Sequence, residues 1–549
     1  MKKRTIWTLA GLILGAGLLM SCGGYDNSAA TLGSAEASSA SDAGDASNVN
    51  IALEAQVTTL DHTVTDVPAD LSVARTMQDT LLEQTETDIR EGLAESYEMS
   101  PDGLTYTFHL RDAKFSNGDP ITAEDFVYSW KRLVNPDTGA AYAWYAGAAG
   151  IENADAIAFE GADLDTLGVE AVDEKTLVVR LDHPVPYFTA IITIPCFSPI
   201  SAAFGQEHPL YGQSAEDILS SGPYVVDEWV PGSAELRLRK NEQYWNKDAI
   251  QMETLTFKAV TDEQSGILSY EAGDLDMVTL TGDMAAKYAD NEALDLELSP
   301  KMEYLYLNHE NPYLKDKNMR LALAYALNKD DITKSILKDG SRSADYFVPE
   351  KFAYDENGVA YHDAVTLQGL SYDEEKALKA FEDAKAALGT EKVSLELLYD
   401  DTAKSKTVSQ YLKSALEKTL PGLTIDLREV PYAACWDEQK AGNFDMTISS
   451  WMADYIDPSS YFDMLVSTNE YNLGNWVNAE YDGYCADAAG KLATDPKARV
   501  DSYGRAEQVI LDDVGLIPVY QTSSASLIRP GIKIRFAPYG SYLYRYITR

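Results

Sequence analysis

The stretch from Leu104 to Pro136 reads LTYTFHLRDAKFSNGDPITAEDFVYSWKRLVNP, and its pattern decides the fold expected for this region. Apolar and polar residues alternate from Leu104 to Leu110, which is the period of a half-buried strand. Asn117 to Pro120 has the composition of a turn. Thr122 is a candidate N-cap with Asp125 three residues later, and apolar residues then recur at helical spacing. The stretch therefore predicts a strand, a turn and an amphipathic helix.

Short strands and helices alternate along the rest of the chain as well. Residues 264–272 are predicted to form a helix that ends at Gly273 and is followed by a strand over 277–280. A strand over 304–308 leads into a helix over 317–327. An αβαβ order then follows, with predicted elements at 372–388, 393–399, 407–420 and 424–430. This interleaving predicts an α/β protein.

The N-terminus indicates secretion. Lys2, Lys3 and Arg4 precede an apolar run from Ile6 to Met20, so we interpret residues 1–21 as a signal peptide. About fifteen apolar residues are fewer than the roughly 20 that a membrane-spanning helix needs. The junction LMSC, which ends at Cys22, resembles a bacterial lipobox, and the alternative is an ordinary cleavage site with a chance cysteine.

The segment 22–48 is predicted to be a flexible tether behind the lipidated cysteine. It is rich in Ala, Ser, Gly and Asp and has no apolar period, so it cannot bury a core. A lipid anchor and a tether would place the protein at the extracytoplasmic face of the cell membrane.

Composition excludes some partners. The chain has 549 residues, of which 45% are hydrophobic, so two or three domains are expected. Its formal net charge of −42 argues against binding to nucleic acid and against docking on anionic lipid headgroups. A solvated acidic surface is the simplest interpretation of this charge.

Three cysteines remain once Cys22 is set aside, namely Cys196, Cys435 and Cys485. They allow one disulfide at most, and none belongs to a CxxC pair or a Cys/His cluster. We interpret them as buried small residues.

The stretch SSWMADYIDPSSYF, from Ser449 to Phe462, places Asp454 among large apolar side chains with no Lys or Arg nearby in sequence. Because desolvating a carboxylate is costly without a positive partner, that partner need not belong to the protein. The alternative is a turn or capping residue, but Asp457 suits that role better because Pro458 follows it at the start of a predicted helix.

Four stretches together resemble the extracytoplasmic peptide-binding proteins of ABC importers, the oligopeptide- and dipeptide-binding type of solute-binding family 5. They span nearly all of the mature chain: LTYTFHLRDAKFSNGDPITAEDFVYSWKRLVNP, SGPYVVDEWVPG with KNEQYWN, NMRLALAYALNKDDI, and WMADYIDPSSYF.

This resemblance implies a two-lobed, periplasmic-binding-protein-like α/β fold of type II, cluster C, with an extra domain inserted in the N-terminal lobe. Lobe I would combine residues 49–80, 201–302 and 514–549. The extra domain would be 81–200, and lobe II would be 303–513. Such boundaries are accurate to about ten residues.

The resemblance also implies that the lobes close around an extended oligopeptide, whose backbone pairs with short protein segments. The corresponding positions are Thr65, Asp66 and Val67 on one side and Ser450, Trp451 and Met452 on the other. Asp454 would bind the α-ammonium of the peptide. Trp451 is also interpretable as a core residue. The partners implied are the peptide and the membrane permease of an ABC importer, and we expect a monomer without cofactor or metal that is not an enzyme.

One departure from the family concerns the C-terminus of the peptide. Some members hold its carboxylate with a basic residue six positions before the amine-binding Asp, and here that position is Ile448. Lys440 or Lys404 would be substitutes, although exposed lysines usually serve as solvated surface. Peptide length and side-chain preference therefore stay open.

Other functions were weighed against peptide binding. Within the same fold the ligand would be an oligosaccharide, haem or a metal chelate, but the six histidines are scattered and only His62 lies near a proposed ligand segment. A signalling peptide is a further alternative to a nutrient. A surface hydrolase is the remote alternative, because the chain has no GxSxG, HExxH or GxxxxGK[ST] motif.

Overall fold

The computed structural model describes residues 47–355 and 357–549 of the chain. The predicted signal peptide, Cys22 and nearly all of the predicted tether lie outside the described residues.

A mixed sheet of eleven strands is the largest element of the fold, and it confirms the predicted α/β class. Its strands follow the order β15-β14-β16-β12-β17-β11-β1-β10-β9-β8, with β13 beside β17. Their bounds are β1 Asn48–Leu53, β8 Tyr224–Trp229, β9 Glu235–Lys240, β10 Thr254–Ala259, β11 Met277–Leu280, β12 Leu294–Leu307, β13 Arg342–Ser343, β14 Val393–Asp400, β15 Leu423–Val430, β16 Met446–Trp451 and β17 Ile517–Ile528.

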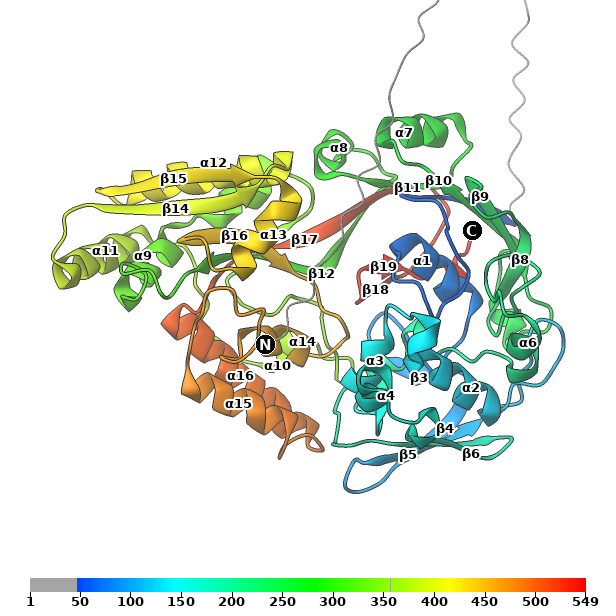
Figure 1. Cartoon of the computed structure of the whole chain (residues 1–549). Helices are drawn as coiled ribbons and strands as arrows, with labels where there is room; N and C mark the ends of the chain where they lie inside the picture. Colours follow the sequence, from blue (N-terminus) through cyan, green and yellow to red (C-terminus); the bar gives the residue numbers. More distant parts are fainter. Residues whose placement is uncertain (1–46, 356) are drawn as a thin grey trace, which may run out of the picture. The chain divides into compact units, whose positions relative to one another are not determined.

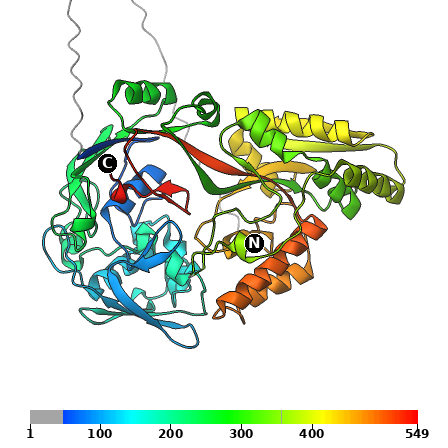
Figure 2. The same cartoon turned by 180° about the vertical axis from the view of Figure 1, so that it is seen from behind.

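Strands β12 and β17 join the two halves of this sheet. They run antiparallel side by side, as both views show (Figures 1 and 2), and β17 also pairs with β11 while β12 also pairs with β16. The pairing of β12 with β17 is interrupted between Leu298 and Met302. Pro300 lies in this gap and has no N–H to donate, so the ladder is weakest at this point.

Helices cover the half of the sheet that contains β14 and β15. α12 packs on both strands, and α11 packs on α9. The helices of this half of the chain are α9 Lys317–Ala326, α10 Tyr361–Ala364, α11 Glu374–Leu388, α12 Ala403–Thr419, α13 Tyr432–Lys440, α14 Ser459–Phe462, α15 Ala479–Ala489 and α16 Pro496–Asp513.

The other half of the sheet carries α1, α6, α7 and α8 and two small hairpins. The bounds are α1 Pro68–Met77, α6 Ala202–Glu207, α7 Glu263–Ala272, α8 Gly282–Lys287, β2 Leu82–Gln84, β3 Ile89–Glu91, β18 Phe536–Ala537 and β19 Ser541–Tyr542. α7 ends at Gly273 in a left-handed conformation with φ 91°, as the sequence predicts.

A second sheet of four strands, β4-β5-β7-β6, is built from residues between 94 and 180. It confirms the predicted strand, turn and helix, because the Asp125 carboxylate accepts the Thr122 N–H (2.8 Å) at the start of α2. Phe108, Phe126 and Trp130 share its buried core. The bounds are β4 Ala94–Met99, β5 Thr105–Leu110, β6 Val169–Asp173, β7 Thr176–Arg180, α2 Ala123–Val134, α3 Ala143–Ala148, α4 Ala154–Glu160 and α5 Phe188–Ile191.

One predicted strand was too short. The prediction over 304–308 covers only the end of β12, which begins ten residues earlier at Leu294. Residues 294–299 alternate apolar and polar side chains, which is the period of a strand, but the prediction missed this signal, and Pro300 separates it from residues 304–308. They are extended because β17 pairs with them.

Within the described ranges, no helix combines the length and apolarity needed to cross a membrane.

The three cysteines of the described residues, Cys196, Cys435 and Cys485, are free and buried. Burial raises the pKa of the Cys435 thiol to about 11.

Candidate functional site

Asp454 lies in the loop between β16 and α14, and this loop is held by its backbone. The Asp454 N–H donates to Ser460 Oγ (2.9 Å), and the Asp454 carbonyl accepts from the Tyr145 hydroxyl (3.0 Å). Both bonds leave the carboxylate free. Among residues 47–355 and 357–549, no Lys, Arg or His forms an ion pair with it.

Burial alone raises the pKa of Asp454 to about 6, because no neighbouring cation opposes the loss of water. The residue nevertheless keeps an exposed surface. The carboxyl group is therefore partly desolvated by the surrounding protein atoms but does not lie inside a packed core.

Asp457, three residues later, has the partner that Asp454 lacks. Arg499 of α16 donates to its carboxylate (2.7 Å), and the two side chains are only 8% and 9% exposed. The same carboxylate accepts the Ser459 N–H (2.9 Å) at the start of α14, which is the capping role that the sequence predicts for Asp457. The sequence could not predict Arg499, because it lies 42 residues away.

Aromatic residues of the four-stranded-sheet region contact the same loop. Tyr145 of α3 donates to the Asp454 carbonyl, and Tyr187 stacks on Tyr455 with ring centroids 4.2 Å apart. These contacts fix the position of Asp454 from a different part of the chain. Sequence reasoning missed Tyr145 and Tyr187, and nothing local to them in the sequence indicates the contact.

The structure assigns no strand to the predicted segment Thr65 to Val67, although the backbone of Val67 is extended. Thr65 is buried, and its Oγ donates to Asp70 (2.9 Å) and accepts the Val67 N–H (3.1 Å). Asp66 is exposed. The backbone N–H groups of Thr65 and Asp66 have no hydrogen-bond partner in the described ranges, so they are available to a ligand.

The hydroxyl of Tyr142 is influenced by acids of both predicted segments. Burial raises the pKa of its hydroxyl, the charge of Arg75 acts against that rise, and the carboxylates of Asp66 and Asp454 add to it. Asp66 and Asp454, 388 positions apart in the sequence, therefore both lie within electrostatic range of one hydroxyl.

The end of β16 has one unpaired edge. Ser450 and Trp451 are opposite Glu303 and Met302 of β12, whereas pairing with β14 ends at Thr447. A cavity of about 720 Å³ adjoins this edge, and its lining includes Ser449 and Ser450.

Trp451 and Met452 differ in burial. The Trp451 indole N–H donates to the Ser460 carbonyl (2.7 Å), and its ring contacts Tyr471 with centroids 5.2 Å apart. Trp451 is therefore half-buried against the core of this region. Met452 is 42% exposed.

Lys440 and Lys404, the two lysines expected to substitute at the peptide carboxylate, differ in whether they already form an ion pair. Ile448 is buried, and Lys440 pairs with Glu470 (3.3 Å). Lys404 lines the large cavity with its Nζ 5.0 Å from the centroid of the Tyr520 ring, and it forms no ion pair within the described part of the chain. Lys404 is the better placed of the two.

The candidate site shows no cluster of metal-binding side chains among the described residues. The described residues contain no group of three or more His, Cys, Asp or Glu side chains arranged to hold a metal ion. His62 is fully buried, and burial lowers its pKa to about 4.

Comparisons with known proteins give consistent matches. Residues 88–472 match the family model of bacterial extracellular solute-binding proteins, family 5 Middle. The dipeptide-binding protein of Lactococcus lactis subsp. cremoris is 30% identical over 507 residues, which cover 88% of this chain and 91% of that protein.

Two solved structures are similar over most of their length. The substrate-binding domain of an oligopeptide ABC transporter from Bacillus anthracis is 32% identical, with a TM-score of 0.67 and coverage of 91% of this chain and 98% of that chain. OppA of Listeria monocytogenes bound to peptide is 30% identical, with a TM-score of 0.66 and coverage of 91% and 99%.

The different pairing of Asp454 and Asp457 predicts different effects on stability. We expect Asp457→Ala to lower the free energy of unfolding by about 3–5 kcal/mol, because Arg499 would be left buried without an anion. We expect Asp454→Ala to leave the free energy of unfolding unchanged or to raise it, because no protein cation loses a partner. Urea denaturation of both variants at neutral pH measures the difference, and equal losses would contradict the assignment of partners.

Proposed function

Because the chain belongs to the bacterial extracellular solute-binding proteins of family 5, we propose that it is a lipid-anchored receptor that captures extracellular oligopeptides and delivers them to an ABC permease. Its two-lobed α/β fold is that of a solute-binding protein. The receptor acts as a monomer, needs no cofactor and catalyses no reaction. The relatives support this proposal, since their names describe binding of dipeptides and oligopeptides.

The observation that carries the proposal is the unpaired carboxylate of Asp454. The α-ammonium of a peptide has a pKa near 8 and therefore arrives positively charged. It supplies the cation that the described part of the protein does not, and a charge-assisted hydrogen bond in a partly desolvated site is stronger than an exposed ion pair.

Backbone groups hold the remainder of the peptide in this proposal. The free edge of β16 at Ser450, Trp451 and Met452 pairs with one side of an extended peptide, and the N–H groups of Thr65 and Asp66 lie on the other side. Pairing of this kind recognises the main chain and not the side chains, which suits a receptor for many sequences. Val67 completes the second segment by directing the chain into α1.

The lobes are proposed with the boundaries given above, as 49–80 with 201–302 and 514–549, the inserted domain 81–200, and 303–513. Strands β12 and β17 are the connection between the lobes. The interrupted pairing at Pro300 is a suitable hinge, because few hydrogen bonds resist bending there.

The affinity for free and blocked peptides tests the role of Asp454. We expect Asp454→Asn to weaken binding of an unblocked peptide about ten- to hundredfold, because hydrogen bonds to charged groups contribute about 1.5–3 kcal/mol. N-acetylation of the peptide removes the same interaction, so acetylated peptide should bind wild type and variant equally.

Isothermal titration calorimetry with a defined pentapeptide provides these affinities. The exposed acid Asp283 in α8 is a matched control, and Asp283→Asn should keep the wild-type affinity. If acetylated and free peptides bind wild type equally well, Asp454 is not the amine-binding residue.

The pH dependence of binding follows from the two ionisations. Because the pKa of Asp454 is about 6 in the free protein, affinity should fall by up to tenfold per pH unit below about 6, where the carboxyl is protonated before the ligand arrives. Above about 8 the α-amine loses its charge and affinity should fall again. Asp454→Asn should abolish the acidic limb, and an acidic limb that persists in this variant would assign it to another group.

The lipid anchor has a separate test. Cys22→Ala should release the protein into the medium or leave the precursor unprocessed, because no thiol remains to carry the lipid. Labelling with a radioactive fatty acid measures the modification, and a Cys22→Ala variant that still incorporates the label would contradict the proposed anchor.

A further inference from the structure

Arg75, in the last turn of α1, is an unusual arginine in this acidic protein. The chain contains 87 Asp and Glu residues but only 45 Lys and Arg residues, so anions are abundant. Arg75 is half-buried, yet within the described ranges its guanidinium forms neither an ion pair nor a hydrogen bond. The guanidinium lies over the ring of Tyr539, whose centroid is 4.3 Å from Cζ.

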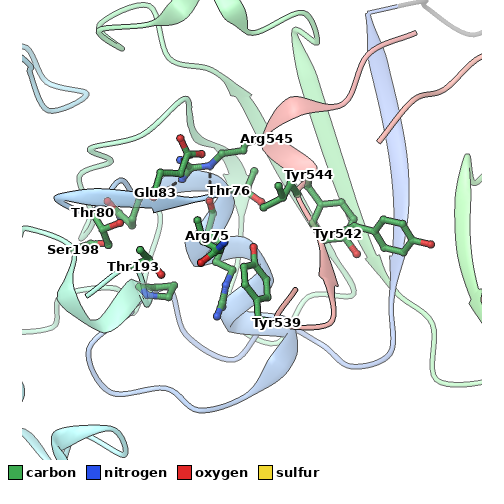
Figure 3. A pocket seen from close by; sticks show the side chains of 14 residues that line it. Arg75, Thr76, Thr80, Glu83, Thr193, Ser198, Tyr539, Tyr542, Tyr544 and Arg545 are labelled. Atoms are coloured by element: carbon green, nitrogen blue, oxygen red, sulfur yellow. Dashed lines mark hydrogen bonds and ion pairs between the residues drawn. The ribbon is translucent and has the colours of Figure 1, made fainter. Parts of the chain in front are cut away.

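Two acids at or beside the small space that Arg75 lines are already paired with other cations. Glu83 binds Arg90 (2.7 Å), and Asp79 binds Arg545 (2.6 Å). Glu83 lines the small space beside Arg75 (Figure 3). Asp79 adjoins this space through its bond to Arg545, which also lines it. Neither carboxylate is therefore the counterion of Arg75.

The space beside Arg75 contains a second polar group without a partner. It is a cavity of about 40 Å³, and its lining includes Arg75, Thr193, Ser198 and Tyr539 (Figure 3). Ser198 is fully buried, and its Oγ has no hydrogen-bond partner in the part of the chain that the structure describes. A buried hydroxyl and a half-buried guanidinium are both donors, so the missing group is an acceptor, and the charge of Arg75 favours an anion.

The contact with Tyr539 does not account for Arg75. A cation–π contact contributes about 0.5–1 kcal/mol at an exposed site and about 2 kcal/mol when it is desolvated. Removing a guanidinium from water without an anion costs several kcal/mol. The position of Arg75 is thus better explained by an anion that is not part of the described protein.

The charges of Arg75 and Asp454 both act on the same aromatic pair. Tyr142 and Tyr145, whose ring centroids are 4.9 Å apart, both lie within electrostatic range of Arg75 and of Asp454. An unpaired cation and an unpaired anion therefore both lie within electrostatic range of these two rings without forming an ion pair with one another. A ligand that carries a positive and a negative group a few bonds apart would offer a partner to each.

We propose that Arg75 binds the side-chain carboxylate of the first residue of the peptide, so that the receptor prefers peptides that begin with Glu or Asp. This inference depends on the proposed function, because it assumes that Asp454 holds the α-ammonium. The side chain of the first residue is the group attached closest to that ammonium. Arg75 also offsets the repulsion that a protein with a net charge of −42 exerts on an acidic ligand.

Two matched pentapeptides test the proposal. Glu-Ala-Ala-Ala-Ala and Gln-Ala-Ala-Ala-Ala differ in charge but hardly in shape, and calorimetry gives their affinities for the full lipid-free protein. We expect wild type to bind the Glu peptide at least about fivefold more tightly, as a charge-assisted contact requires. The ratio is the readout, because any general loss of affinity affects both peptides.

Variants then assign the preference to Arg75. Arg75→Gln should reduce the ratio to about one, and Arg75→Lys should retain part of it because the charge remains. Arg505, an exposed arginine of α16, is the matched control, and Arg505→Gln should keep the wild-type ratio.

The outcomes separate this inference from the proposed function. A wild-type ratio of one with clear binding of both peptides overturns the role of Arg75 and leaves peptide binding intact. A preference that survives in Arg75→Gln, or that is equally large when Glu is moved to the third position, also overturns it. Failure of wild type to bind either peptide would instead contradict the proposed function.

Discussion

The site depends on one electrostatic constraint, which is that a partly desolvated carboxylate needs a positive partner. The chain supplies a cation to some buried aspartates, as Arg499 does for Asp457 and Arg132 does for Asp61, and it supplies hydrogen-bond donors to others, as Thr58 and Thr65 do for the carboxylate of Asp70. It supplies neither to Asp454 within the described residues, and burial accordingly raises the pKa of that carboxyl. A protein that merely needed a stable loop here would gain nothing from a carboxylate, so the constraint indicates a cation that arrives with a ligand.

The rest of the fold holds this carboxylate in place and leaves it accessible. β16 ends at the site because β12 pairs with it up to Trp451, and Ser460 and Tyr145 then fix the backbone of Asp454. Tyr145 and Tyr187 come from the region of the four-stranded sheet, so the loop is positioned by two parts of the chain. The Tyr461 hydroxyl donates to the Pro300 carbonyl, which ties α14 to the interruption in β12. Bending at that interruption would therefore move the loop that carries Asp454, which would couple the proposed hinge to the proposed site.

Local patterns predicted much of the fold, whereas contacts between distant residues were out of reach. The strand, turn and capped helix between Leu104 and Val134 follow from alternation, a turn and a cap, and the structure contains each of them. The first half of β12 also alternates from Leu294 to Ser299, but Pro300 interrupts the pattern, and only the pairing with β17 shows that one strand continues to Leu307. At the site, the sequence identified Asp454 by the absence of a nearby base. It could not identify Arg499 or Tyr145, because only the folded chain brings them to the loop.

The most direct test of the central claim is a crystal structure of the protein with a bound peptide whose N-terminus is unblocked. The account predicts that a carboxylate oxygen of Asp454 lies about 2.7–2.9 Å from the peptide's α-amino nitrogen, as in other charge-assisted hydrogen bonds. A complex in which the amino group lies elsewhere, while Asp454 faces bulk water or pairs with a cation of the protein itself, would contradict it.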